Sequence, residues 1–182
     1  MPIVKIEAFT FEYDEVQDRI RLSGNLYNSG QEISFWLTRR LALRLLNAAT
    51  GLVEKTSPSI VNTPLDHRSA MVLFEHENAK NINSEAVEFG KKMTATDDDY
   101  ITDSMSVSEP EILNRLDISF KNNRYSLSFF ASSQDEAIAV SVIDYNQLHQ
   151  ILSIIHKGAL KLDWGVEVSL FAEPEQVAYT LQ

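Results

Sequence analysis

The chain has 182 residues, 44% of them hydrophobic and 23% charged, a composition typical of a globular protein long enough to bury its own core. It contains no cysteine, which excludes disulfides, thiol nucleophiles and thiolate metal sites. The formal net charge of −10 argues against general nucleic-acid binding, which needs a concentrated basic face. The first residues lack a signal-peptide pattern, and no apolar run approaches the roughly 18 residues of a membrane span. We therefore expect a soluble cytoplasmic protein that does not engage a membrane.

The first part of the chain predicts three strands followed by a helix. Apolar and polar residues alternate over residues 4–14 and more regularly over 18–28, which is the spacing of half-buried strands. Residues 32–37 supply a third strand. Thr38 is then a helix N-cap, after which the apolar period lengthens to about 3.6 residues. Its apolar residues form one stripe of Leu41, Leu45, Ala48 and Leu52, with Ala42, Leu46 and Ala49 beside it.

A loop with two prolines follows, and then a second helical pattern. Asp66 is a suitable cap for this helix, whose inner positions we expect to be Ala70, Met71, Phe74 and Asn78. Residues 83–93 predict one or two further helical turns.

Residues 94–111 are strongly acidic. They hold six acidic residues and no basic one, and so carry more than half of the net charge. An EF-hand needs carboxylates at alternate positions and a mid-loop glycine. This segment instead has consecutive acids and no glycine, its foremost acidic residues being Asp97, Asp98, Asp99 and Asp103. We interpret it as a solvated linker, with weak divalent-ion binding as the alternative.

The remaining chain repeats the order of the first part. Residues 113–120, 124–131 and 137–143 read as strands separated by short turns. Asp144 is an N-cap with Gln147 three residues later, which is a capping box, and the helix is expected to end before Gly158. Alternation over residues 159–173 predicts a last strand.

These patterns predict an α+β fold, with an antiparallel sheet packed by helices. The repeated order fits two pseudo-symmetric β-β-β-α units, although strand-strand-strand-helix is also a common order in unrelated segments. We expect residues 1–93 to form the first unit with an added helical segment, 94–111 the acidic linker, and 112–182 the second unit. The two units could also form one compact domain.

Three arginines stand on the otherwise apolar first helix. At 100° per residue Arg40 and Arg44 fall into one narrow polar stripe, and Arg39 lies at its margin. Arginine covers apolar surface with the aliphatic part of its side chain and keeps its charge in water, so we first interpret the stripe as the solvent-exposed edge of a core helix. Positive charge in the first helical turn opposes the helix dipole, however. A contact for an anion or an acidic partner is therefore the alternative.

Histidines next to acids raise the question of a metal site. Glu75 and His76, together with His67, are residue types that suit zinc, iron or manganese. His67 and His76 are nine residues apart, which places them on opposite faces of one helix, so a plain surface helix is the favoured interpretation. His149 and His156 share a helix face but lie two turns apart, too far for one ion. We expect both at an exposed or partly buried helix edge.

Recognisable catalytic and cofactor motifs are missing. The six glycines form neither a phosphate-binding loop nor a nucleophile elbow. The adjacent aromatic pairs 35–36 and 129–130 place one ring of each pair on the outer face of its strand, so the sheet is either covered on both faces or partly exposed. We expect the helices over residues 66–93 to cover one pair and a dimer contact to cover the other. We expect a non-catalytic protein-interaction or structural module without cofactor, binding itself as a homodimer or another protein. The alternative is a small-molecule-binding or metal-assisted enzymatic domain with a pocket near residues 66–93.

Overall fold

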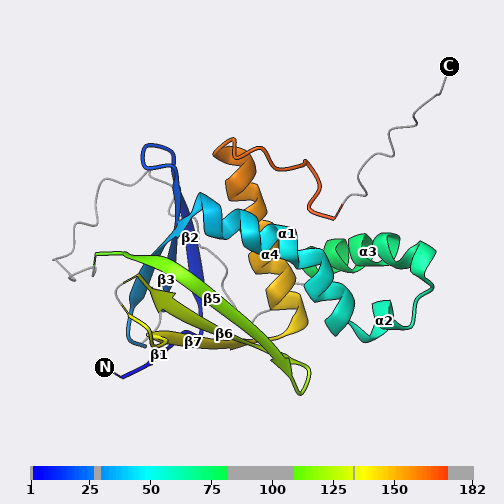
Figure 1. Ribbon diagram of the computed structural model, residues 1–182, viewed down its shortest axis with the longest axis horizontal. Helices are drawn as coiled ribbons and strands as arrows, with labels where there is room; N and C mark the ends of the chain where they lie inside the picture. The colour runs from blue at the N-terminus through cyan, green and yellow to red at the C-terminus, as the bar shows by residue number, and fades with distance from the viewer. Residues whose placement is uncertain (1, 27–29, 82–108, 133, 172–182) are drawn as a thin grey trace.

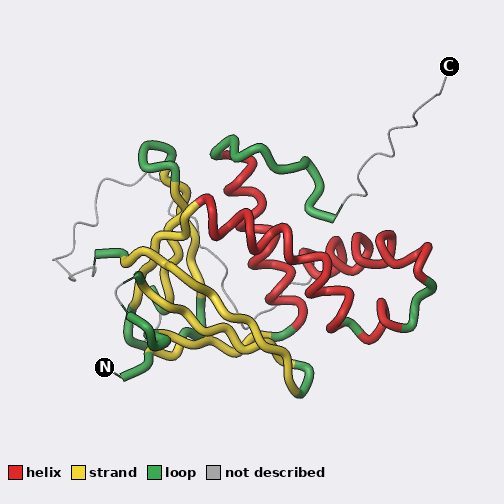
Figure 2. Tube along the Cα trace, in the orientation of Figure 1, coloured by secondary structure: helices red, strands yellow, loops and turns green. Residues whose placement is uncertain are grey.

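The computed structural model describes residues 2–26, 30–81, 109–132 and 134–171 (Figure 1). The described elements are β1 (Val4–Lys5), β2 (Phe9–Asp14), β3 (Arg19–Gly24), β4 (Ile33–Thr38), α1 (Arg39–Thr56), α2 (Pro58–Val61), the short 3-10 helix η1 (Leu65–His67), α3 (Arg68–Asn81), β5 (Glu111–Lys121), β6 (Arg124–Ala131), β7 (Ala139–Ile143) and α4 (Tyr145–Lys161). The strands gather on one side of the molecule and the helices on the other (Figure 2). In this part of the chain, no helix has the length and apolarity to cross a membrane.

All the described strands form one sheet in the order β1-β7-β6-β5-β4-β3-β2, so the predicted α+β class is confirmed. The expectation of an antiparallel sheet is wrong, because β1 pairs with β7 and β4 with β5 in parallel. Strands joined by hairpins are antiparallel within β2–β4 and within β5–β7. The parallel pair of β4 and β5 lies where these two meanders meet edge to edge, and the other joins the short strand β1 to the outer edge of β7.

The N-terminal segment links the two ends of this strand order. β1 lies at one end and β2 at the other, yet only residues 6–8 separate them. The four residue steps from Lys5 to Phe9 span at most roughly 14 Å, so the sheet must curl until its ends are close. Asn25 fastens the junction: its Oδ1 accepts from the Glu7 N–H at 2.9 Å, and its Nδ2 donates to the Lys5 carbonyl at 2.8 Å.

The hydrophobic core lies between the sheet and the helices. Phe35 and Phe129 stack there with ring centroids 5.5 Å apart, and both are buried. Their outward-facing neighbours are covered by arginine side chains: Arg19 lies over Trp36 and Arg115 over Phe130, at 6.0 and 3.7 Å from the ring centroids. Both aromatic pairs thus divide between the core and an arginine-covered outer face.

Helix α1 begins where predicted, and it buries the second of the two apolar stripes. Thr38 caps it by accepting from the Leu41 N–H, as expected. Its buried residues are Ala42, Leu46, Ala49 and Val53. In the neighbouring stripe the leucines are half-buried and Ala48 is exposed. Two apolar stripes lie side by side on this helix, and periodicity alone does not say which one faces the core.

Helix α4 has the predicted capping box but continues to Lys161, beyond the predicted end at Gly158. A Cβ at Gly158 would lie 2.4 Å from Cε1 of Tyr13 and 2.8 Å from Cδ1 of Ile20. Gly158 therefore permits close packing of α4 on the sheet and does not terminate the helix.

The predicted last strand is wrong. Residues 159–161 belong to α4, and residues 162–171 form no strand. Trp164 is buried and its Nε1 donates to Asp18 Oδ1 at 2.5 Å, while Val168 is almost fully exposed. The alternating apolar residues thus serve as separate anchors of an irregular segment over the helices.

The predicted inner face of α3 is also wrong. The helix buries Val72, His76 and Ala79, and Phe74 is 62% exposed. The inward face is occupied by a polar cluster, which the apolar pattern does not reveal. The turns expected over 83–93 and the acidic residues Asp97, Asp98, Asp99 and Asp103 lie outside the described residues.

Candidate functional site

A polar cluster is built into the helical layer where α1, α3 and α4 meet. Glu75 on α3 accepts hydrogen bonds from Ser57 Oγ, at 2.9 and 3.2 Å, and from the Tyr145 hydroxyl of α4. Beside it, the hydroxyls of Thr56 and Tyr125 lie 2.5 Å apart. Burial, followed by the hydrogen bond to Glu75, raises the pKa of Tyr145, so this hydroxyl keeps its proton and remains a donor.

Two histidines continue this cluster into the core. His76 and His149 are 4% and 0% exposed, and their Nδ1 atoms lie 2.9 Å apart. Tyr145 packs edge-on against His149 with ring centroids 4.4 Å apart, and Phe171 packs edge-on against His76 at 4.7 Å. One Nδ1 must donate and the other accept, so the two rings are in opposite tautomers. Nε2 of His149 is buried without a partner among the described residues.

Burial keeps both rings neutral. It lowers the pKa of His76 to about 4, with a smaller contribution in the same direction from His149. It also lowers the pKa of His149 to about 4, against an opposing effect of the Glu75 carboxylate. A neutral histidine with a carboxylate nearby is suited to acid-base chemistry, but these rings are sealed beneath Phe171.

The residues considered for a metal site do not converge. His67 lies exposed beside Asp66, with their side-chain atoms 3.8 Å apart. Glu75 and His76 are adjacent but contact different partners, Tyr145 and His149. Across the ranges that the structure describes, no group of three or more His, Asp or Glu side chains is placed to hold a metal ion.

The expected exposure of His149 and His156 is wrong, because both are buried. His149 faces α3, and Nε2 of His156 donates to the Glu167 carbonyl at 2.7 Å. One signal was available for His76: it stands four residues after Val72 and three before Ala79, so it shares their buried stripe. No sequence pattern indicated the contact with His149, which is 73 positions away.

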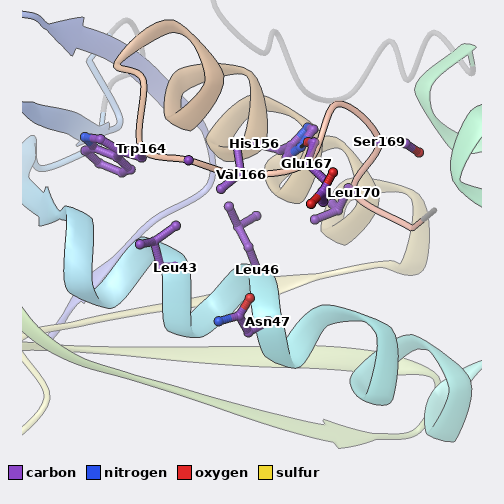
Figure 3. Close-up of a pocket in the computed structure, with 10 residues that line it drawn as sticks. Leu43, Leu46, Asn47, His156, Trp164, Val166, Glu167, Ser169 and Leu170 are labelled. Carbon is purple, nitrogen blue, oxygen red and sulfur yellow. Dashed lines mark hydrogen bonds between the residues drawn. The ribbon is translucent and has the colours of Figure 1, made fainter. Parts of the chain in front are cut away.

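A cavity of about 300 Å³ lies beneath the segment that follows α4. Figure 3 shows His156 and Asn47 near the same hollow as the leucines of α1, with the segment passing above. The lining mixes apolar and polar side chains in similar proportion. Its residues are Leu43, Leu46, Asn47, His156, Trp164, Gly165, Val166, Glu167, Ser169 and Leu170.

The three arginines of α1 separate in the structure. Arg39 donates from Nη2 to the Trp164 carbonyl at 3.3 Å. Arg40 and Arg44 are exposed and line a cavity of about 290 Å³. No carboxylate among the described residues forms an ion pair with either of them. The other lining residues are Thr38, Leu41, Ile112, Leu113 and Asn114.

The cavity lined by Arg40 and Arg44 lies where the pairing of β4 with β5 ends. Their parallel pairing consists of Phe35 with Glu111 and Trp36 with Ile112, and goes no further. From Leu113 to Lys121, β5 pairs only with β6, so its other edge has no strand partner among the described residues. Asn114 stands at a register shift where this open edge begins. Figure 1 shows β5 and β6 extending past β4 as a two-stranded ribbon.

Sequence patterns did not reveal this edge, because they predict strands but not their neighbours. The structure therefore presents a sealed polar cluster, a cavity beneath the C-terminal segment, and an open strand edge with two arginines at one end. No protein-family model, curated protein or solved structure matches this chain.

Proposed function

We propose that this protein is a non-catalytic protein-interaction module that binds an extended segment of a partner along β5. The supporting observation is the unpaired edge of β5 beyond Ile112. Such an edge offers alternating N–H donors and C=O acceptors to one further strand. Strand addition of this kind gains affinity from main-chain hydrogen bonds and needs no cofactor.

The surroundings of this edge supply specificity. Helix α1 contacts β5, and its stripe of Leu41, Leu45 and Leu52 is only half-buried. Apolar side chains of an added segment gain free energy by covering such surface. Arg40 and Arg44 stand at the beginning of the open edge, where guanidinium groups suit a carboxylate. The preferred segment along β5 is therefore extended and partly apolar, and Arg40 and Arg44 suit a separate carboxylate at the beginning of the edge.

Pseudo-symmetry of the two β-β-β-α units, which we also propose, strengthens the role of these arginines. Each meander is followed by a helix, and the two meanders adjoin through the parallel pair of β4 and β5. Superposing the caps Thr38 and Asp144 matches the arginine stripe with Asn146 and Gln150 of α4. A neutral stripe on the matching helix implies that the fold does not require arginine, which leaves binding as the reason for the charge.

Amide hydrogen exchange of ¹⁵N-labelled protein tests the proposal. The amides of Leu116, Ile118 and Phe120 face the open edge, so they should become protected in concentrated protein or in unlabelled extract of the source cells. The amides of Asp117 and Ser119, which face β6, provide the internal control. Ile118→Pro removes an edge N–H that β6 does not use, and should prevent the new protection while the β6-facing amides stay slow. Unchanged exchange at the edge amides in both conditions would contradict the proposal.

A second candidate function is small-molecule binding in the cavity beneath the segment that follows α4. It is favoured by the lining of that cavity, where buried His156 stands among apolar side chains. Native mass spectrometry should then show an added mass that disappears under denaturing conditions. Leu46→Trp should abolish the added mass by filling the cavity, and Leu65→Trp, on exposed η1, should not. A protein that carries no added mass when purified gently from its source would count against this candidate.

A further inference from the structure

We propose that β5 binds β5 of a second copy of this chain, in an antiparallel register centred on Ser119. This inference rests on the proposed strand-addition function and specifies its partner. The open edge belongs to a strand whose charged residues alternate in sign on one face, so that few self-pairings are electrostatically favourable. These residues are Arg115, Asp117 and Lys121.

The hairpin decides which backbone groups are available. Asn122 and Asn123, at φ of 52° and 59°, form a two-residue turn that closes on the pair Lys121 and Arg124. In such a hairpin the closing pair exchanges both backbone hydrogen bonds, and every second pair beyond it does the same. The backbone groups of Leu116, Ile118 and Phe120 therefore point to the open edge. A symmetric partner strand must place these even-numbered residues opposite one another.

Electrostatics and space remove most of the allowed registers. A register centred on Leu116 places the second copy opposite Ile112, where β4 already pairs. One centred on Asp117 puts this carboxylate against its own copy, and one centred on Ile118 puts Arg115 against Lys121. Like charges directly opposite each other on a sheet are destabilising.

The register centred on Ser119 satisfies each requirement. It places Asp117 opposite Lys121 of the second copy, and by symmetry Lys121 opposite Asp117, which gives two attractive pairs. Both are non-hydrogen-bonded pairs, in which side chains approach most closely. Ile118 then exchanges backbone hydrogen bonds with Phe120 of the second copy. These two side chains are partly exposed in the single chain and lie on the face that packs toward the helices.

Charge reversal provides a sharp test. Asp117→Lys and Lys121→Glu should each convert both attractive pairs into repulsive ones. Sedimentation equilibrium should show dimerisation weakened by about tenfold or more in either variant. An equimolar mixture of the two variants restores opposite charges at both positions. Native mass spectrometry of this mixture should show a heterodimer that is at least as abundant as the wild-type dimer. Lys157→Glu, an exposed reversal on α4, is the matched control and should leave dimerisation unchanged.

Three results would overturn the inference: a monomer at all concentrations, a dimer insensitive to both reversals, or a mixture that associates no better than its components. Amide exchange on the same samples distinguishes a failure of self-association from a failure of strand addition as such. Protected edge amides in source-cell extract of a monomeric chain would remove the second copy as partner and keep strand addition. Edge amides that never become protected would remove both.

Discussion

His76 and His149 face each other across the helical layer with their Nδ1 atoms 2.9 Å apart, although 73 positions separate them in the sequence. This hydrogen bond requires one proton between the two facing nitrogens. A proton added at Nε2 of the donor ring leaves this hydrogen bond in place but puts a charge in a buried site, removed from water. Protonation of both rings makes both Nδ1 atoms donors and must break the contact that joins α3 to α4. The charged and titratable groups near the pair are Glu75, Glu77, Lys80 and His156.

Acid should consequently destabilise the fold through this pair. Each histidine has a pKa of about 4 in the folded chain, lowered from 6.5, so the unfolded chain binds more protons between these values. The stabilising contribution is complete above pH 6.5 and is lost as the pH falls toward 4. We expect the loss to approach about 3 kcal/mol per histidine. Urea unfolding at a series of pH values measures it.

A double variant isolates the contribution of this pair to the pH dependence. His76→Gln combined with His149→Gln should flatten the slope of unfolding free energy against pH between pH 6.5 and 4. A double variant with the wild-type slope would show that the pair does not titrate in this range.

Two glycines should respond to alanine in opposite ways. Gly158→Ala places a methyl group 2.4 Å from Tyr13 Cε1, so we expect a destabilisation of about 1–3 kcal/mol. Gly51, also on a helix, has nothing within 4 Å of an added Cβ. Gly51→Ala should stabilise the protein by about 0.5–1 kcal/mol through helix propensity. Thermal unfolding of both variants checks the contrast, and equal effects would contradict the close packing of α4 on β2.

Two tyrosine hydroxyls should differ in their contribution to stability. Tyr145 donates to the Glu75 carboxylate, and Tyr13 donates to the Ile154 carbonyl at 2.8 Å. Hydrogen bonds to charged groups contribute more than those to neutral ones. We expect Tyr145→Phe to cost about 1.5–3 kcal/mol and Tyr13→Phe about 0.5–1.5 kcal/mol, measured by denaturant unfolding. The reverse order would mean that Glu75 is not a charged acceptor in the folded chain.

We expect Arg40 to lower the stability of the folded chain, because its proposed role is in binding. It stands in the first turn of α1, where no acidic residue offsets the helix dipole. Arg40→Gln should raise the unfolding free energy by about 0.3–1 kcal/mol. Arg39→Gln is the comparison, because it removes the hydrogen bond to the Trp164 carbonyl and should give no such gain. A loss of stability in Arg40→Gln would indicate that its charge is compensated within the fold.

The sequence by itself determined most of the local elements and the starts of the two long helices. Alternation identified β2, β3, β4, β6 and β7, and side-chain caps placed the starts of α1 and α4 at Thr38 and Asp144. These features depend on interactions between residues that are close in the sequence, so they can be predicted from it. The same reasoning failed beyond Leu162, where apolar residues alternate without any strand to pair with.

Only the tertiary structure decided which groups meet. Two contacts join segments that are far apart in the chain: that of His76 with His149, and that of Gly158 with Tyr13. The open edge of β5 likewise depends on where a distant strand, β4, ends its pairing. Periodicity shows that a residue faces one side of its own element, but it does not identify the neighbour on that side. The physical reason is that hydrophobic burial is non-directional, so the choice among partners falls to packing, backbone pairing and charge once the whole fold has formed.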